Sequence, residues 1–185
     1  MLDDVIKELR SGIDKSIEAL RRDLSRVRTG RAHAGMLDAI RVDYYGVPTP
    51  LQQMANVAVP EPRLITIKPW EKGQAKAIEK AIRESDLNLN PQVDGDLIRI
   101  PIPALTEERR KEMVKLARKN GEEAKVAIRK HRRDTNEMID SLEKDGDVSG
   151  DDADRSKKKV EDIVAEGIKQ VDGIIAAKEK DILEV

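Results

Sequence analysis

Hydrophobic positions recur every three or four residues in three long stretches of this chain. The longest stretch, from Thr106 to Leu142, keeps apolar or small side chains on one stripe through roughly ten turns of a 3.6-residue helix. Stretches from Leu2 to Thr29 and after Ser149 follow the same spacing. Because each stripe must be covered on one side, the pattern predicts three helices packed in an antiparallel bundle.

Local signals predict where these helices begin and end. Thr106 is expected to cap the longest helix, and Ser149 with Asp152 three residues later predicts a capping box at the start of the last one. Gly30 is expected to end the first helix by supplying a left-handed residue.

The segment from 31 to 104 has a different pattern, in which short alternating runs predict strands around a single helix. Alternation predicts a strand at 40–45, with further strands at 54–59, 64–68 and 98–102 and a helix at 73–85. The prolines of 46–50 predict a turn, because they break strand pairing. This pattern indicates a compact α+β module of about 70 residues, near the size at which one core is marginal.

The order of these segments predicts two domains, of α+β class overall. One helix precedes the module and two follow it, so the small domain, 31–104, is inserted into a bundle formed by 1–30 and 105–185. Two short chain connections then join the domains. We therefore predict a hinge at these connections, formed by Gly30 and Arg31 on one strand of chain and Pro103 and Ala104 on the other.

Charge is distributed unevenly, although the whole chain carries a net charge of only −1. From 106 to 133 there are eleven Lys and Arg against five Asp and Glu, and from 134 to 155 there are two against nine. On a helical wheel, basic residues fall within about 60° of Arg129 and opposite the apolar stripe, interrupted only by Glu122. These are Lys111, Lys115, Arg118, Lys125, Arg132 and Arg133.

Such a face favours binding to the phosphates of nucleic acid, since Arg can grip a phosphate with two parallel hydrogen bonds. Aromatic residues make up only 2% of the chain, so binding would depend on shape and phosphate rather than on base stacking. A helical scaffold whose charged face is merely solvated is the alternative interpretation.

Signals for catalysis or metal binding are weak. There is no Cys, and the two histidines, His33 and His131, lie far apart in the sequence without a motif around them. The turn after 144 matches part of a calcium loop, but Ser156 stands where the closing Glu should be. The pattern therefore disfavours an enzyme and predicts no cofactor or metal. With no apolar leader or membrane span, we expect a soluble, cytoplasmic protein.

Several motifs resemble those of bacterial ribosome recycling factor, in order and from end to end of the chain. They are Arg28-Thr-Gly-Arg31-Ala32, Tyr44-Tyr45-Gly46 with Pro48-Thr49-Pro50, Glu79-Lys-Ala-Ile-Arg83 with Ser85-Asp86-Leu87, Leu105-Thr-Glu-Glu-Arg-Arg110, and Val126-Ala-Ile-Arg129 with Arg132-Arg133. The resemblance implies an L-shaped molecule that mimics tRNA in size, with a three-helix bundle and a smaller β/α/β domain on a flexible elbow.

The resemblance also implies a function and its residues. A protein of this family splits the post-termination ribosome into subunits together with elongation factor G and GTP, and its bundle lies along the RNA of the large ribosomal subunit. We expect a monomer that binds no membrane. The positions that the family implies for rRNA binding are Arg28, Arg31, Arg110, Arg129 and Arg132, with Arg133 as the adjoining residue, and the helical wheel alone adds Arg118 and Lys125.

The chain departs from the family pattern in three places. It has Lys130-His131 where Asn-Ile is usual, Asn88 where Gly is usual, and Ala34 where Pro is frequent. Asn88 can adopt a left-handed backbone conformation. His131 replaces an apolar packing residue, so we expect this departure to affect the packing of the bundle rather than its RNA face.

Overall fold

The computed structural model describes residues 1–184, which divide into two compact units. The first unit consists of Met1–Arg28 with Glu107–Leu183, and the second of Thr29–Thr106 together with Glu184. A long helical bundle and a small unit with a sheet confirm the predicted α+β class.

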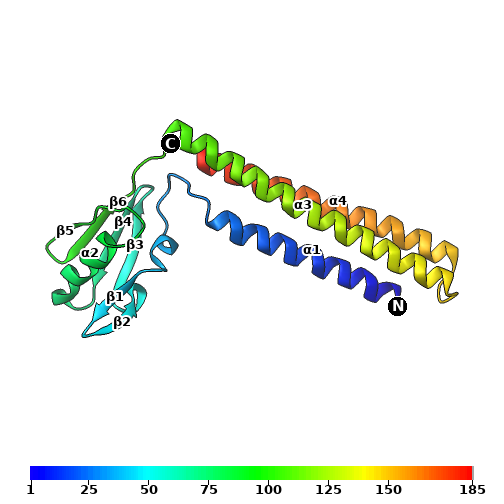
Figure 1. Cartoon of the computed structure of the whole chain (residues 1–185), viewed down its shortest axis with the longest axis horizontal. Coiled ribbons are helices and arrows are strands. Elements are labelled where there is room, and N and C mark those ends of the chain that lie inside the picture. Colours follow the sequence, from blue (N-terminus) through cyan, green and yellow to red (C-terminus); the bar gives the residue numbers. More distant parts are fainter. Residues whose placement is uncertain (185) are drawn as a thin grey trace. The chain divides into compact units, whose positions relative to one another are not determined.

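Three long helices form the first unit: α1 (Leu2–Ser25), α3 (Glu107–Lys144) and α4 (Gly150–Leu183). They lie side by side, with α3 antiparallel to both of the others (Figure 1). The stripes that the spacing predicts are the ones that the bundle buries. The largest fully buried side chains of this core are Leu9, Ile128, Ile139 and Ile182.

The ends of the helices agree with the sequence except at the end of α1. The predicted start of α4 at Ser149 is confirmed, because the Asp152 amide donates to Ser149 Oγ at 3.1 Å; the Ser149 hydroxyl in turn donates to the Asp152 carboxylate at 2.8 Å, where a full capping box would use the Ser149 backbone amide. The prediction for Gly30 was wrong. Helix α1 ends at Ser25, and Gly30 is not among the residues with positive φ.

The last turn of α1 tightens instead of turning left-handed. The Val27 amide donates to the carbonyl three residues back, at Leu24, over 3.1 Å. The Ser25 hydroxyl donates to the Arg22 carbonyl over 2.6 Å. These bonds satisfy carbonyl groups at the helix end, so no left-handed residue is required there.

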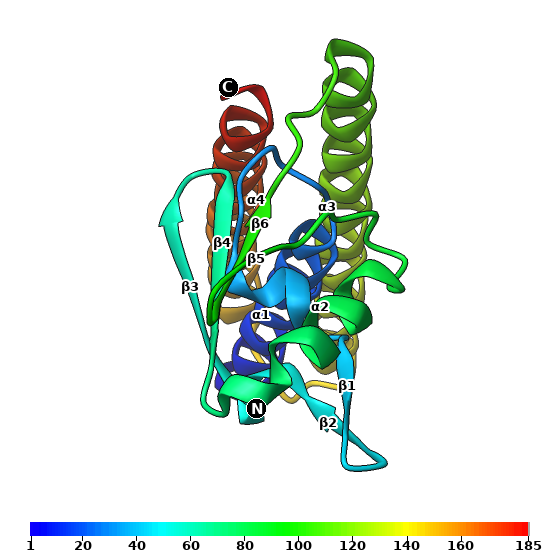
Figure 2. The same cartoon turned by 90° about the vertical axis from the view of Figure 1, so that its left-hand side faces the viewer.

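A four-stranded antiparallel sheet organises the second unit, in the order β3-β4-β6-β5. Figure 2 shows α2 (Ala75–Arg83) and a separate β1–β2 hairpin beside this sheet. The core of the unit combines inward-facing isoleucines of the sheet with Ile78 and Ile82 of α2. The strands are β1 (Arg41–Tyr44), β2 (Val47–Pro50), β3 (Ala55–Glu61), β4 (Leu64–Pro69), β5 (Gln92–Asp94) and β6 (Leu97–Pro101), and the short 3₁₀ turns are Ala34–Leu37, Leu51–Gln53 and Lys72–Gln74.

The prediction of a turn over 46–50 was wrong, because β2 occupies most of it. The turn is only Tyr45-Gly46, both with positive φ (50° and 83°), and it joins β1 directly to β2. In a two-residue hairpin the flanking pair is hydrogen-bonded and the pairs then alternate. Pro48 and Pro50 fall opposite Asp43 and Arg41, at positions where no amide has to donate across the hairpin.

The second unit also contains a left-handed residue at Asn88 and a short edge strand, β5. Asn88 has a φ of 51°, so it adopts the left-handed conformation expected where the family usually has Gly. Strand β5 was not predicted. All three of its residues are exposed, and without a buried side there is no alternation to recognise.

Candidate nucleic-acid interface

The basic face of α3 divides into two rows that differ in their contacts with α4. An inner row contains Arg118, Lys125 and Arg132, which follow one another at seven-residue spacing along the side of α3 next to α4. An outer row lies farther from α4 and contains Lys111, Lys115, Arg129 and Arg133, all exposed. At 1.5 Å per residue, the basic residues from Arg110 to Arg133 extend over about 35 Å of helix.

Each residue of the inner row faces a carboxylate of α4. Arg118 donates to both carboxylate oxygens of Glu179, from Nε at 2.5 Å and from Nη2 at 3.3 Å. Lys125 Nζ lies 2.5 Å from Asp172 Oδ1, and Arg132 Nη1 lies 3.7 Å from Glu161 Oε2. On α3 itself Glu122 is the one acid that the helical wheel places on this face, and α4 supplies the further carboxylates.

These pairs shift the protonation equilibria of their members. Hydrogen bonding to Arg118 lowers the pKa of the Glu179 carboxyl, and the same bond raises the pKa of the Arg118 guanidinium. Hydrogen bonding to Asp172 raises the pKa of Lys125, with partial burial acting in the opposite direction. All three groups are therefore held in their charged forms.

The outer row is available to an external anion. Within residues 1–184, no ion pair involves Lys115, Arg129 or Arg133, whereas Lys111 pairs with Glu107 of its own helix at 3.1 Å. Arg129 and Arg133 are four residues apart and hence neighbours on the same face. Two guanidinium groups in this arrangement can bind one phosphate together or two adjacent ones.

The remaining predicted RNA-binding residues lie in different surroundings. Arg110 is half-buried in the first turn of α3, and its Nε is buried without a hydrogen-bond partner in the described part of the chain. Arg28 is exposed, three residues after the end of α1. Arg31 belongs to the second unit and forms an ion pair with Glu184. Only the six residues on α3 are thus brought together on one element.

His131 packs inside the bundle rather than on the basic face. Its Nε2 lies 3.3 Å from Ser16 Oγ of α1, and its ring fills the space that Gly12 leaves. A Cβ at position 12 would lie 2.9 Å from the ring. The imidazole is therefore accommodated by a small residue on the facing helix, which explains how the bundle accepts this departure from the family pattern.

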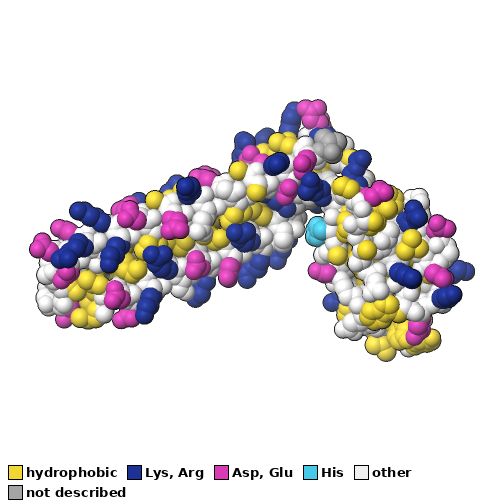
Figure 3. Space-filling model, turned by 180° about the vertical axis from the view of Figure 1, so that it is seen from behind, with side chains coloured by type: hydrophobic (Ala, Val, Ile, Leu, Met, Phe, Trp, Pro, Cys, Tyr) yellow, Lys and Arg dark blue, Asp and Glu magenta, His cyan; other side chains and the backbone are white. Residues whose placement is uncertain are grey.

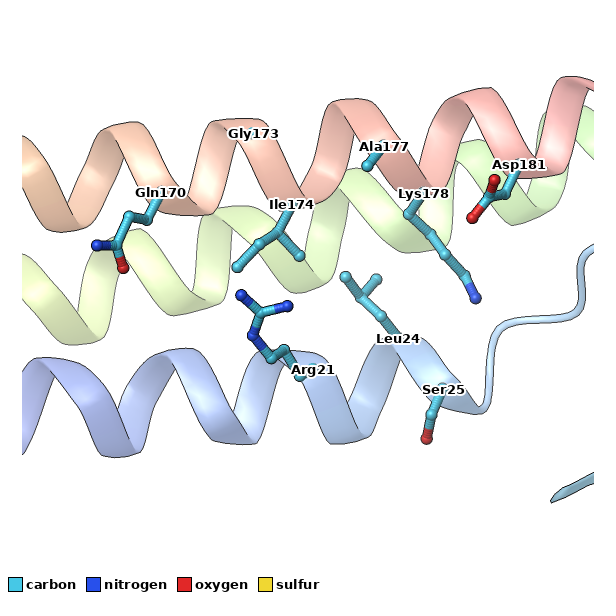
Figure 4. A pocket seen from close by; sticks show the side chains of 9 residues that line it. All are labelled: Arg21, Leu24, Ser25, Gln170, Gly173, Ile174, Ala177, Lys178 and Asp181. Carbon is cyan, nitrogen blue, oxygen red and sulfur yellow. The ribbon is translucent and has the colours of Figure 1, made fainter.

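A groove opens on another side of the bundle, between α1 and α4. It has a volume of about 530 Å³, with Leu24, Ile174 and Ala177 on its floor and Arg21 and Lys178 directed into it (Figure 4). Burial lowers the pKa of Lys178, and Asp181 opposes this only in part. On the face drawn in Figure 3, hydrophobic side chains form a band along the bundle between mixed acidic and basic ones. That face does not have the one-sided charge of α3.

Comparison with known proteins identifies the family to which this chain is related. The family model described as ribosome recycling factor matches residues 20–183. The chain belongs to the ribosome recycling factor family. The family match covers all of α3 and α4, so both rows of basic residues lie inside it.

Relatives in this family match over the whole length of the chain. The ribosome-recycling factor of Sorangium cellulosum (strain So ce56) is 80% identical over 185 residues, which is all of both chains. That of Anaeromyxobacter dehalogenans (strain 2CP-C) is 56% identical over 183 residues, covering 99% of this chain and 97% of the relative.

Solved structures of the family share the fold. A solution structure of the ribosome recycling factor is 40% identical, covers 100% of this chain and 98% of its own, and superposes with a TM-score of 0.75. A model of the Thermus thermophilus ribosome recycling factor, described together with Escherichia coli elongation factor G bound to the post-termination complex, is 42% identical with a TM-score of 0.65 and covers 99% of each chain.

Residues 1–184 contain neither a helix suited to span a membrane nor a cluster of metal-binding side chains. None of the helices has the length and hydropathy that crossing a bilayer requires. No group of three or more His, Cys, Asp or Glu side chains is arranged to hold a metal ion. In the acidic turn, Ser149 and Asp152 are hydrogen-bonded to each other at the start of α4.

Proposed function

We propose that this member of the ribosome recycling factor family binds the rRNA of the large ribosomal subunit through α3 and, with elongation factor G and GTP, splits the post-termination ribosome into subunits. The observation that carries the proposal is the outer row, in which Arg129 and Arg133 stand exposed with no ion pair in residues 1–184. The family relationship supports the recycling role, and a related factor is described with elongation factor G on the post-termination complex.

Phosphate is the ligand that best fits this row. The chain has only three aromatic residues, and all of them lie in the second unit, so α3 offers no ring on which a base could stack. Arginine side chains on a helix instead bind the backbone of structured RNA through charge and shape. If roughly five side chains each displace one counterion, log affinity falls against log salt with a slope of about −3.5 to −4.5.

In this proposal the chain itself catalyses no reaction and holds no nucleotide. The GTPase partner supplies the free energy by pushing on the factor, and the bundle acts as a wedge between the ribosomal subunits. The work takes place in the cytoplasm, where the post-termination ribosome is found.

The connections between the units form the proposed hinge. Gly30, Arg31, Pro103 and Ala104 lie in the two stretches of chain that cross from one unit to the other. A Cβ built at Gly30 has no heavy atom within 4 Å, so no packed side chain restrains this position. Hinges are commonly formed by a few residues in loops or at the ends of elements, which can absorb large changes in φ and ψ.

The hinge is tested with Trp70, the only tryptophan, which lies in the second unit. Energy transfer from Trp70 to a dye on a cysteine introduced at exposed Ala176 of α4 should give a broad distribution of distances in the free protein. Binding to the ribosome should narrow it. A single narrow distance, unchanged on binding, would contradict a working hinge.

The domain limits, 1–30 with 105–185 and 31–104, are tested by removing the insertion. A chain in which a short Gly/Ser linker replaces 31–104 should keep a helical, cooperatively melting bundle, because the core of the first unit is formed without the second. Loss of most of the helical circular dichroism would show that the bundle depends on the inserted segment.

The decisive experiment combines binding with subunit splitting. The variant Arg129→Glu/Arg133→Glu should bind purified large subunits more weakly than the parent protein. Each lost charge-assisted hydrogen bond is worth about 1.5 kcal/mol, so each should lower the affinity at least roughly tenfold. Sedimentation of post-termination ribosomes with elongation factor G and GTP should then show fewer free subunits than with the parent protein.

The matched control is Lys159→Glu/Lys158→Glu, which changes the net charge of the protein equally. Both lysines are exposed on α4, and neither forms an ion pair within residues 1–184. Lys178 is unsuitable for this purpose, since it is partly buried in the groove and its replacement would alter packing. Equal affinity of the parent and the Arg129/Arg133 variant at physiological salt would overturn the proposal.

A further inference from the structure

The three acidic partners of the inner row form a repeated pattern across the contact of α3 with α4. Arg118 meets Glu179, Lys125 meets Asp172, and Arg132 meets Glu161. The pattern links the predicted RNA-binding face to a second helix along most of its length.

The carboxylates occupy the donors that an RNA phosphate would need. Glu179 accepts from Nε and Nη2 of Arg118, which is the side of the guanidinium fork that commonly binds a phosphate in two-point fashion. Lys125 directs its ammonium at Asp172 and, over 3.4 Å, at Glu122. A phosphate approaching Arg118 or Lys125 therefore has to displace a carboxylate that is already bound, whereas Arg132 and Glu161 form a longer ion pair of 3.7 Å.

The inner row is nevertheless within reach of RNA. The Arg118 side chain is 66% exposed and that of Arg132 is 42% exposed, while Lys125 is only 18% exposed. Ion pairs with an exposed member, such as those of Arg118 and Arg132, contribute little to folding. Stability alone does not explain why three carboxylates of α4 should stand opposite three cations of the binding face.

We propose that Glu179, Asp172 and Glu161 are affinity-determining residues, which compete with rRNA phosphates for the inner row and so keep binding weak enough for release. This inference rests on the proposed function. Lys115, Arg129 and Arg133 of the outer row bind phosphate without competition, whereas a contact with Arg118 or Lys125 forms only by exchange of a carboxylate for a phosphate. Both arrangements satisfy the cation, so the net gain from each exchange is small and the complex remains reversible.

The test removes the competing charges and measures affinity for purified large ribosomal subunits at about 0.15 M salt. Glu179→Gln and Asp172→Asn should each tighten binding by roughly 1.4- to 5-fold, which corresponds to the strength of an exposed ion pair, and the two together by the product. The rate of dissociation should fall correspondingly, since affinity changes at one interface act mainly on that rate.

The control is Glu166→Gln, which removes the same charge from the same helix. Glu166 is exposed, forms no ion pair within residues 1–184, and lies roughly 120° round α4 from Asp172. It should change affinity much less than Glu179→Gln. If the control tightens binding equally, the effect is one of net charge, and the proposal fails.

A double-mutant cycle isolates competition at one pair. In an Arg118→Gln background, Glu179→Gln should no longer tighten binding, because the cation for which it competes is gone. Persistence of the full effect in that background would overturn the proposal. The outcome is separate from the fate of the proposed function, since Arg129→Glu/Arg133→Glu tests RNA binding without touching any carboxylate of α4.

Discussion

Helix α4 contacts α3 on one side and α1 on the other, and the two sides are built differently. On the α3 side, ion pairs span the rim and Ile175 fills the space left by Gly121, where a Cβ would lie 2.7 Å from Ile175 Cγ1. On the α1 side, the helices are close at Gly167, where a Cβ would lie 2.9 Å from Ile13 Cγ2. A Cβ added at Gly173 would meet no other part of the molecule within 4 Å, and the groove opens here.

The two sides of α4 also differ in the charges that face each other. Across the α3 side, cations face carboxylates, and the long side chains bridge the gap above the apolar core. Across the open part of the α1 side, Arg21 and Lys178 carry the same charge, so they provide no attraction between the helices. On the α3 side, the cations of α3 therefore have carboxylates of α4 as partners. On the α1 side, Lys178 is left partly buried in the groove.

The largest loss of stability should come from replacing Ile128 of α3, which is fully buried in the bundle and lies near Gly167 of α4. Ile128→Ala should lower the free energy of unfolding by about 2–4 kcal/mol, because it leaves a cavity at the centre of the bundle. Urea denaturation followed by circular dichroism measures this. Val126→Ala, two residues away and 60% exposed, should change it by less than about 0.5 kcal/mol.

Two glycines of α4 test the contrast within the α1 side, between the tight packing at Gly167 and the open groove at Gly173. Gly167→Ala should destabilise the bundle by about 1–2 kcal/mol, since its Cβ would press on the buried, β-branched Ile13. Gly173→Ala should stabilise it by about 0.5–1 kcal/mol, the usual helix-propensity gain in open space. Melting temperatures that move in the same direction for both variants would contradict the proposed difference in packing.

Lys178 provides a smaller and pH-dependent test of the open groove. Burial makes its pKa lower in the folded chain than in the unfolded chain, so the unfolded chain binds more protons between those two values. The stability of the parent should therefore rise with pH through the window below about 10.4. Lys178→Met should abolish this rise and stabilise the fold by roughly 0.5 kcal/mol at neutral pH, as measured by urea titrations from pH 7 to 10.

The smallest change in folding free energy should come from breaking an ion pair between α3 and α4. A double-mutant cycle of Arg118→Gln and Glu179→Gln should give a coupling free energy of folding of about 0.2–1 kcal/mol at low salt. The coupling should shrink at 1 M salt, where screening acts over about 3 Å. A coupling above about 2 kcal/mol would mean that the pair serves folding more than binding, and would weaken the idea that phosphates displace the carboxylate.

The sequence predicted the bundle well because its signals are long and repeated. A stripe that persists for many turns leaves little doubt about a helix, and the Ser149 cap fixed the start of α4. Shorter signals were less informative. The exposed strand β5 has no alternation, and the sequence does not reveal the register that makes Pro48 and Pro50 of β2 compatible with pairing.

The candidate site was predicted in part, for a similar reason. A helical wheel places Arg118, Lys125 and Arg132 relative to the stripe of their own helix, but it does not contain the facing helix. Their seven-residue spacing is one signal in the sequence. On a straight helix, residues seven apart differ in direction by about 20°, so the three cations shift step by step toward one side of α3. Which acids of α4 stand there depends on the register of packing, which only the structure provides.

The bundle is assembled from segments that are separated in the chain, and this has a consequence for its synthesis. Helix α1 ends at Ser25, whereas α3 begins only at Glu107. At about 5–20 residues per second, the apolar stripe of α1 leaves the translating ribosome several seconds before its partners are made. The contiguous inserted segment has that interval in which to fold. We expect a chaperone that binds exposed hydrophobic helices to encounter α1 during this delay, and pauses in translation before α3 to lengthen it.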